Sequence, residues 1–246
     1  MKQTVTFKSQ QQLIFASLSL PCRGAPCIIV SHGMESSKDG SKWPVLARYL
    51  YEAGFACLRF SHRGCGEGAE KSQGEFADTT LSSRIQDYRA AIDYIETAGV
   101  DTHRLGAVGS SFGGMVALAA GDIRLKALAI LSTPCRFQMP SEEFLKAYRN
   151  DDLFDLPSGN KIKAGFWRDI QEYDMCRAAA SLNRPLLIVH GSADELVPVD
   201  NAREIYECAR KLRRLEIVAG ASHRFDNPDH LERFISLSLD WFKQYL

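Results

Sequence analysis

The segment VGSSFGG, residues 108–114, places two adjacent serines between glycines, a pattern that can present a nucleophile. Gly-x-Ser-x-Gly is weak by itself, but here the apolar run RLGAV precedes it and the helix-like stretch MVALAAGD follows. This order predicts a sharp strand–turn–helix junction that exposes a serine hydroxyl. Strand and helix pass close together there, so the residues two before and two after the serine must be small. Gly109 and Gly113 meet that condition only around Ser111, which leaves Ser110 as a spacer.

A serine hydroxyl needs a base to accept its proton, and the base needs an acid to orient it. Two later loops supply these groups: Asp194 follows the apolar run PLLIVHG, and His223 follows RLEIVAG. In the order Ser111, Asp194, His223 the three side chains are predicted to form a catalytic triad. Taken singly, Asp194 could close a turn and His223 could be a solvated loop residue. Weaker candidates for the acid are Glu195, Asp174, Asp226 and Asp229.

Negative charge that develops on a substrate oxygen must be stabilised by N–H groups, an arrangement called an oxyanion hole. The Phe112 N–H, directly after the nucleophile, is one expected donor. The second is the Met34 N–H, in the loop after the apolar run IIVS, where Gly33 permits a tight turn. His32 precedes this loop and is interpreted as bracing it by hydrogen bonds rather than as the catalytic base.

The elements that must position these groups alternate between strand and helix. Apolar runs rich in β-branched residues are separated by helical patterns at residues 81–98, 200–212 and from Asn227 onward. This alternation predicts an α/β fold: a mostly parallel, doubly wound sheet of about eight strands, covered on both faces. The predicted strands are TVTF, LIFASLSL, CIIVS, FACLRF, LGAVG, ALAILS, PLLIVHG and RLEIVAG.

One stretch is longer than a crossover between strands requires, and we interpret it as a small cap over the strand ends. The cap is expected at residues 135–180, inserted between core segments 1–134 and 181–246, and its LPSGNKI sequence predicts a tight hairpin. The alternative is a pair of ordinary crossover helices with a surface loop. Aromatic cap residues could bind an apolar or aromatic acyl group, or could simply pack the cap onto the core. The substrate-binding candidates are Phe144, Tyr148 and Trp167.

Composition narrows the choice of partners. The 246 residues carry no net charge and no basic stripe, which argues against nucleic acid or an anionic membrane as a partner. The opening residues, MKQTVTFKSQQQ, have no apolar stretch of signal-peptide length, and no later run could span a bilayer. We therefore expect a cytoplasmic protein, for which the sequence leaves a homodimer open.

The cysteines are odd in number and scattered, which favours reduced thiols over a disulfide framework. Cys22 and Cys27 have no matching Cys/His pair, so no metal site is expected. The seven cysteines are Cys22, Cys27, Cys57, Cys65, Cys135, Cys176 and Cys208.

Five motifs over nearly the whole chain together resemble the α/β-hydrolase superfamily. They are HGMESS, FSHRGCGEG, GSSFGG, HGSADELVP and GASHRF. The second departs from the family pattern at Ser61, where many members have Asp, and its Arg63 is expected to be a structural anchor. The small size and the cap are most similar to serine esterases of the feruloyl/cinnamoyl-esterase and acyl-esterase type, with serine aminopeptidase-like relatives close by. The resemblance implies the same site residues: Ser111, Asp194, His223, Met34 and Phe112.

These features predict a serine hydrolase that cleaves carboxylic esters of small to medium acyl or aryl substrates through an acyl-enzyme. Its partner would be a small-molecule ester, and the chemistry needs no cofactor. The same triad could instead act on a thioester, an amide or peptide, or a carbon–carbon bond beside a carbonyl. A non-catalytic, ligand-binding protein is the remaining alternative.

Overall fold

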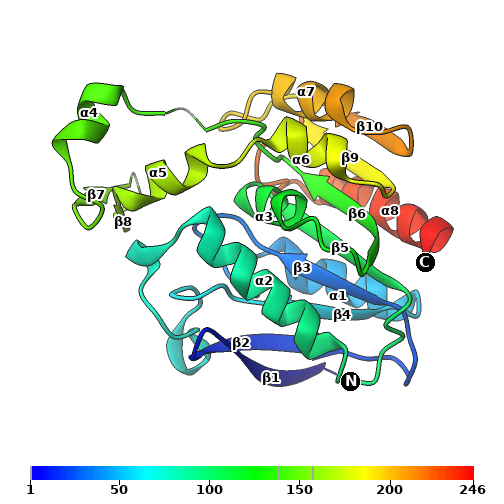
Figure 1. Cartoon of the computed structure of the whole chain (residues 1–246). Coiled ribbons are helices and arrows are strands. Elements are labelled where there is room, and N and C mark those ends of the chain that lie inside the picture. Colours follow the sequence, from blue (N-terminus) through cyan, green and yellow to red (C-terminus); the bar gives the residue numbers. More distant parts are fainter. Residues whose placement is uncertain (1, 138, 157) are drawn as a thin grey trace.

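Eight strands form one sheet in the computed structural model, which describes residues 2–137, 139–156 and 158–246. The spatial order is β1-β2-β4-β3-β5-β6-β9-β10; β1 and β2 are antiparallel to their neighbours and the other six strands are parallel (Figure 1). The predicted α/β fold with a mostly parallel sheet is confirmed. The strands are β1 (Lys2–Ser9), β2 (Gln12–Ser19), β3 (Cys27–Ser31), β4 (Ala56–Phe60), β5 (Leu105–Ser110), β6 (Leu125–Leu131), β9 (Leu186–Gly191) and β10 (Arg213–Val218).

The central strands are apolar along their whole length because helices cover both of their faces. Every residue of β3, β4, β5 and β9 is buried, whereas the edge strands β1 and β10 leave several side chains exposed. Parallel strands place their carboxyl ends at one edge of the sheet, so the loops that follow them converge there. The site is built at that edge.

Helices α1 and α8 pack on one face of the sheet, and α2, α3, α6 and α7 pack on the other, which produces two separate apolar cores (Figure 1). Two short 3₁₀ turns, at Gly68–Glu70 and Phe76–Asp78, lie between β4 and α2. The helices are α1 (Lys42–Glu52), α2 (Leu81–Ile95), α3 (Phe112–Ala120), α6 (Met175–Ser181), α7 (Asp200–Cys208) and α8 (Pro228–Tyr245).

Local sequence explains where the long helices begin. Thr80 caps α2 through a capping box with Ser83, and the Asn227 side chain accepts hydrogen bonds from the first turn of α8. Ser238, in the apolar stripe of α8, is buried because its hydroxyl donates to the Phe234 carbonyl. The helix predicted over 200–212 is shorter than expected: it ends at Cys208, and Leu212 is exposed.

Between β6 and β9 the chain leaves the sheet. Part of this stretch projects beyond the strand ends, whereas α6 packs against α3 and α7 on the body of the fold (Figure 1). The hairpin expected at LPSGNKI is present as β7 and β8. The elements of this stretch that precede α6 are α4 (Glu142–Ala147), β7 (Leu153–Asp155), β8 (Lys161–Lys163) and α5 (Gly165–Gln171). Of these, α5 packs against α2, and its Phe166 and Ile170 are buried in the core.

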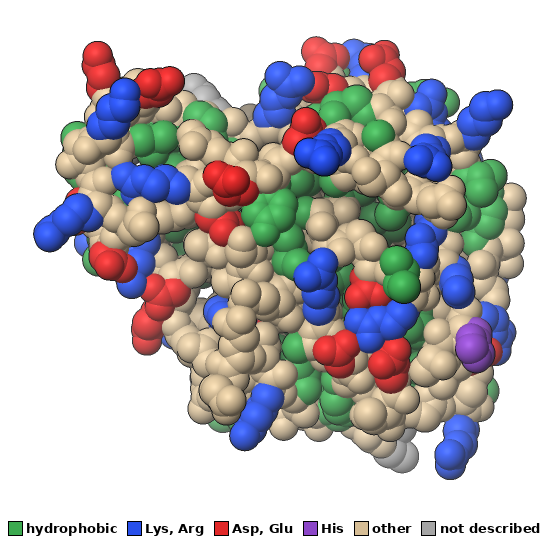
Figure 2. Space-filling view, viewed as in Figure 1, with side chains coloured by type: hydrophobic (Ala, Val, Ile, Leu, Met, Phe, Trp, Pro, Cys, Tyr) green, Lys and Arg blue, Asp and Glu red, His purple; other side chains and the backbone are tan. Residues whose placement is uncertain are grey.

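Basic and acidic side chains are interspersed over the face shown in Figure 2 rather than gathered into fields of one sign. This pattern matches the zero net charge of the sequence. In the described parts of the chain, no helix combines the length and the apolar character that crossing a membrane would require.

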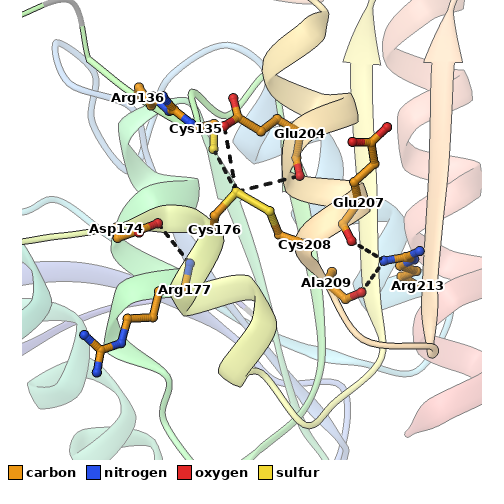
Figure 3. Close-up of a disulfide and its surroundings, with 10 residues drawn as sticks. All are labelled: Cys135, Arg136, Asp174, Cys176, Arg177, Glu204, Glu207, Cys208, Ala209 and Arg213. Atoms are coloured by element: carbon orange, nitrogen blue, oxygen red, sulfur yellow. Dashed lines mark hydrogen bonds and ion pairs between the residues drawn. A yellow bond between two sulfur atoms is a disulfide. The ribbon is translucent and has the colours of Figure 1, made fainter.

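A disulfide links Cys176 of α6 to Cys208 at the end of α7, with the Cys135 thiol 3.8 Å from Cys176 Sγ (Figure 3). The expectation of reduced thiols is therefore wrong for this pair. The two cysteines are 32 residues apart, and only the packing of α6 against α7 brings them together. Cys135 and Cys22 remain free thiols, the first buried and the second exposed.

We expect the Cys176→Ser/Cys208→Ser protein to be less stable than the wild type by about 3 kcal/mol, because the bond closes a long loop in the unfolded chain. Urea unfolding without reductant measures the difference. Adding dithiothreitol should lower the unfolding free energy of the wild type to that of the variant. Equal midpoints without reductant would contradict the bond.

Candidate active site

Ser111 occupies a sharp turn between the end of β5 and the start of α3. Its backbone has φ 54° and ψ −125°, a conformation that costs a non-glycine residue about 1–3 kcal/mol. The turn persists because two glycines let the chain pack tightly around it. A Cβ on Gly109 would lie 2.5 Å from the Gly113 carbonyl oxygen, and a Cβ on Gly113 would lie 2.1 Å from the Ser31 carbonyl oxygen. The spacing that favours Ser111 over Ser110 thus has a direct steric cause.

The structure brings the three predicted triad residues together at the carboxyl edge of the sheet. His223 Nε2 lies 3.1 Å from Ser111 Oγ. On the other side of the ring, His223 Nδ1 lies 2.9 Å from Asp194 Oδ2 and 3.0 Å from Oδ1. The carboxylate holds the proton on Nδ1, so Nε2 is left to accept the serine proton. The geometry is that of a nucleophile, a base and an orienting acid in series.

Asp194 is held as a carboxylate by donors from several directions. Burial alone would raise its pKa, but hydrogen bonds from His190, His223 and the Val197 N–H lower the pKa below its usual range. Asp194 Oδ1 also accepts from the Leu196 N–H at 3.0 Å. His190 is fully buried at the end of β9, with Nε2 3.2 Å from Asp194 Oδ2. The acid is therefore rigid as well as charged.

The alternative acids lie elsewhere. Glu195 accepts the backbone N–H of His223 at 3.2 Å, so it touches the histidine loop but not the ring. Asp174 accepts the Arg177 N–H as the cap of α6. Asp229 lies in the first turn of α8. Only Asp194 has its carboxylate on His223 Nδ1 among the residues that the structure describes.

The two expected oxyanion donors flank Ser111. Phe112 begins α3 directly after the serine, and Met34 follows Gly33, where an added Cβ would lie only 3.4 Å from Ser111 Cβ. In the part of the chain that the structure describes, neither the Met34 nor the Phe112 N–H donates a hydrogen bond to another residue. Both residues line the cavity in front of Ser111. These N–H groups are free to bind a substrate oxygen.

A fully buried arginine holds the loop that carries Met34. Arg84 of α2 donates to the Gly33 carbonyl at 2.9 Å and to the Met34 carbonyl at 2.6 Å. His32 Nε2 accepts the His62 N–H, so its Nδ1 carries the proton and donates to the same Gly33 carbonyl. Burial and nearby positive groups lower the pKa of His32, which keeps it neutral. His32 thus braces the loop, as the sequence predicted.

An ion pair between Arg63 and the buried Asp87 anchors the turn after β4. The Arg63 guanidinium and backbone N–H bind the Asp87 carboxylate at 2.7–3.0 Å, which agrees with the anchoring role expected for Arg63. Burial lowers the pKa of neighbouring His62 to about 4 against the opposing effect of Asp87. Ser61, where the sequence departs from the family pattern, accepts the Lys38 N–H at 3.1 Å. The departure therefore leaves the triad untouched.

Sequence reasoning missed Arg84, although a signal was present. It falls on the apolar stripe of α2, one position before Ile85, where a charged residue must find buried partners. It also missed His190, the last residue but one of the apolar strand β9. In both cases the signal is a polar residue at a position of a helix or strand that is otherwise apolar.

An apolar cavity of about 640 Å³ opens in front of Ser111 and His223. Trp167 lines it, as expected of a substrate-binding candidate. Tyr148 does not line it, because its ring packs against Phe154 at 4.7 Å. The side chain of Phe144 lies outside what the structure describes. The apolar residues of the insertion between β6 and β9 that line the cavity are Phe137, Leu156, Ile162, Phe166 and Trp167, and Arg136 lines it as well.

The fold is that of the α/β-hydrolases. Est1E from Butyrivibrio proteoclasticus, solved with ferulic acid bound, superposes with a TM-score of 0.83 and 23% identity, covering 97% of this chain and 99% of its own. A dienelactone hydrolase from Anabaena variabilis superposes with a TM-score of 0.71 and 19% identity, covering 100% and 98%.

Residues 45–246 match the family described as "Prolyl oligopeptidase family", so the chain belongs to that family. Among curated proteins it is similar to "Putative esterase YitV" of Bacillus subtilis, at 25% identity over 241 residues, 91% of each chain. The family to which the chain belongs and the superfamily predicted from its motifs are consistent with each other.

Gly113→Ala should destabilise the protein by about 1–3 kcal/mol or more, because its methyl group would overlap the Ser31 carbonyl in a junction that cannot expand. Thermal or urea unfolding measures the change. Gly165→Ala, at the first position of α5, is the matched control, since its nearest contact would be 3.4 Å. A Gly113→Ala protein as stable as this control would refute the steric account of the turn.

Proposed function

We propose that the protein is a serine hydrolase that cleaves carboxylic esters of small to medium acyl or aryl groups through an acyl-enzyme. The observation that carries the proposal is the continuous hydrogen-bonded series from Asp194 through His223 to Ser111, beside two unoccupied N–H donors. Ligand binding alone requires no such series. The apolar cavity in front of it fits a hydrophobic acyl or aryl group.

In the first half of the reaction, Ser111 Oγ attacks the ester carbonyl while His223 Nε2 accepts its proton. Asp194 stabilises the imidazolium that forms and stays ionised. The carbonyl oxygen, now negative, binds the N–H groups of Met34 and Phe112. When the tetrahedral intermediate collapses, the ester C–O bond breaks and His223 returns the proton to the departing alcohol.

In the second half, water replaces the alcohol. His223 removes a proton from the water as it attacks the acyl-enzyme carbonyl, and the same two N–H groups hold the second oxyanion. Collapse releases the carboxylic acid, and the proton on His223 returns to Ser111. Every group that this cycle requires is supplied by the chain or by water.

The relatives favour an ester among the bonds that a triad can cleave. YitV carries the printed description of an esterase, and ferulic acid, the ligand of Est1E, is an aromatic acid of the size that the cavity would admit. The name of the family supports a second candidate, a peptide bond. Rates on para-nitrophenyl butyrate, an acyl thioester and an aminoacyl para-nitroanilide would rank the candidates.

Ser111→Ala should lower kcat/KM on para-nitrophenyl butyrate by at least about a thousandfold, because no other hydroxyl is placed on His223 Nε2 in the described chain. Ser110→Ala should lose far less, since its hydroxyl faces Lys42 instead. Both variants are measured beside the wild type in the same chromogenic assay. If Ser111→Ala kept the wild-type rate, the proposed mechanism would be wrong.

Arg84→Met should lower kcat about 10- to 100-fold with little change in KM, because it releases the loop that holds the Met34 N–H against the oxyanion. Arg89→Met is the matched control: Arg89 lies on the same helix but donates to the Ala120 carbonyl, away from the site. A partial recovery of kcat in Arg84→Lys would support the positioning role. A folded Arg84→Met protein with wild-type kcat would contradict it.

A further inference from the structure

A second cavity meets the apolar one at the catalytic serine. It encloses about 360 Å³, and both cavities are lined by Met34, Ser111 and His223. Its other walls are not formed by cap aromatics. They come from residues 40–43, where α1 begins, from Ser110, and from Arg224 beside the catalytic histidine. An ester whose carbonyl group lies at Ser111 would therefore place its acyl part in one cavity and its alcohol part in the other.

The dominant charge in the second cavity is the ammonium of Lys42. Its Nζ donates to Ser110 Oγ at 3.2 Å, one residue away from the nucleophile. Among the described residues it has no ion-pair partner, in contrast to Lys38, which contacts both Asp39 and Glu70. Burial lowers the pKa of Lys42 to about 8, and Arg224 acts in the same direction. The charged form of such an ammonium group would be stabilised by an anion bound in this cavity.

The neighbouring carboxylates do not form an ion pair with Lys42, so an anion could bind there. Asp194 and Asp226 attract Lys42, but Asp194 is committed to His223 and Asp226 is exposed without contacting Nζ. Glu35 also lines the cavity, yet its carboxylate accepts hydrogen bonds from Ser158 and Asn160 of the cap hairpin. The two cationic side chains thus face the cavity without a local carboxylate that pairs with them.

We propose that this cavity is an anion subsite, and that the substrate is an ester with an apolar half in the cap cavity and a carboxylate or phosphate on the other half, bound by Lys42 with Arg224 nearby. The proposal rests on the function proposed above and adds the substrate class. Lys42 Nζ also lies 5.5 Å from the centroid of the Trp43 ring. The proposal explains why a partly buried lysine beside Ser111 has no carboxylate partner among the described residues, an arrangement that would otherwise cost free energy.

The test compares matched esters. One pair is para-nitrophenyl butyrate and its analogue with a carboxylate ortho to the nitro group. The other is para-nitrophenyl pentanoate and the para-nitrophenyl monoester of glutaric acid, which places the carboxylate on the acyl half. The readout is the ratio of kcat/KM for the charged ester to that for the neutral ester. Intrinsic reactivity cancels when this ratio is compared between proteins.

In one of the two pairs, Lys42→Met should lower this ratio about tenfold relative to the wild type, the effect of losing one partly buried charge interaction. Lys126→Met, which removes an exposed lysine of β6, should leave the ratio unchanged. A purely structural role of Lys42 would lower the rates on charged and neutral esters together. An unchanged ratio in both pairs would overturn the proposal.

Protonation gives a second readout. Between about pH 6.5 and 9 the wild-type ratio should fall with a midpoint near the Lys42 pKa, because the carboxylate loses its cationic partner. Lys42→Arg should keep the ratio high across this range. The groups facing Lys42 are Asp194, Asp226, Arg224, His223 and Glu35. Both esters of a pair react at the same His223, so its protonation cancels. A wild-type ratio independent of pH would count against the subsite.

Binding separates failure of the subsite from failure of the esterase. Ser111→Ala protein is titrated by calorimetry with para-nitrophenol and with its ortho-carboxylate analogue, and the titration is repeated with Lys42→Met added. Tighter binding of the carboxylate that depends on Lys42 would support the subsite even if no ester were cleaved. Ester cleavage through Ser111 without any effect of Lys42, in rates or in binding, would refute the subsite and leave the proposed function intact.

Discussion

The site depends on how closely three backbone segments approach at one point. The end of β5, the start of α3 and the end of β3 meet at Ser111, where hydrogen atoms of Gly109 and Gly113 replace side chains. The contact forces Ser111 into a strained backbone conformation with positive φ, which the tight packing holds. Its hydroxyl then projects from the sheet, and the Phe112 N–H is left free at the first position of a helix. One steric constraint thus exposes the hydroxyl and frees the donor beside it.

The other groups reach this point from strand ends along the same edge. The loops after β9 and β10 bring Asp194 and His223, and the loop after β3 brings Met34. The buried Arg84 and His32 hold that last loop through hydrogen bonds to its carbonyl groups. The buried charge of Arg84 fixes the position of the loop through directional hydrogen bonds, which apolar packing does not provide.

The insertion between β6 and β9 packs against Phe112, next to Ser111. Phe112 packs against Phe137 at 5.7 Å and against Phe166 at 5.6 Å, so the residue that follows Ser111 contacts the aromatic side chains of the insertion. These rings continue to Trp167, which lines the apolar cavity. The aromatic side chains of the insertion therefore pack against the turn at Ser111 and form part of the wall of the apolar cavity.

Local patterns in the sequence were enough to predict the sheet, the turn at Ser111 and the loops of Asp194 and His223. Each of these features depends on residues that are close together in the chain. The pattern is an apolar strand followed by a turn with a glycine and then by a polar residue. Lys42 was missed because SSKDGSKW reads as a solvated loop. Tyr148 was assigned to the cavity and Cys176 to the free thiols for a related reason. Their surroundings depend on how the insertion and two separate helices pack, which no short pattern encodes.

The central claim is that His223 activates Ser111 alone among the serines of this chain. Labelling with a fluorophosphonate, followed by peptide mass spectrometry, tests it directly. The account predicts a single adduct on the peptide that contains Ser111, formed far more slowly in the His223→Ala protein. Folded wild-type protein that forms no adduct, or forms it on another serine, would contradict the account.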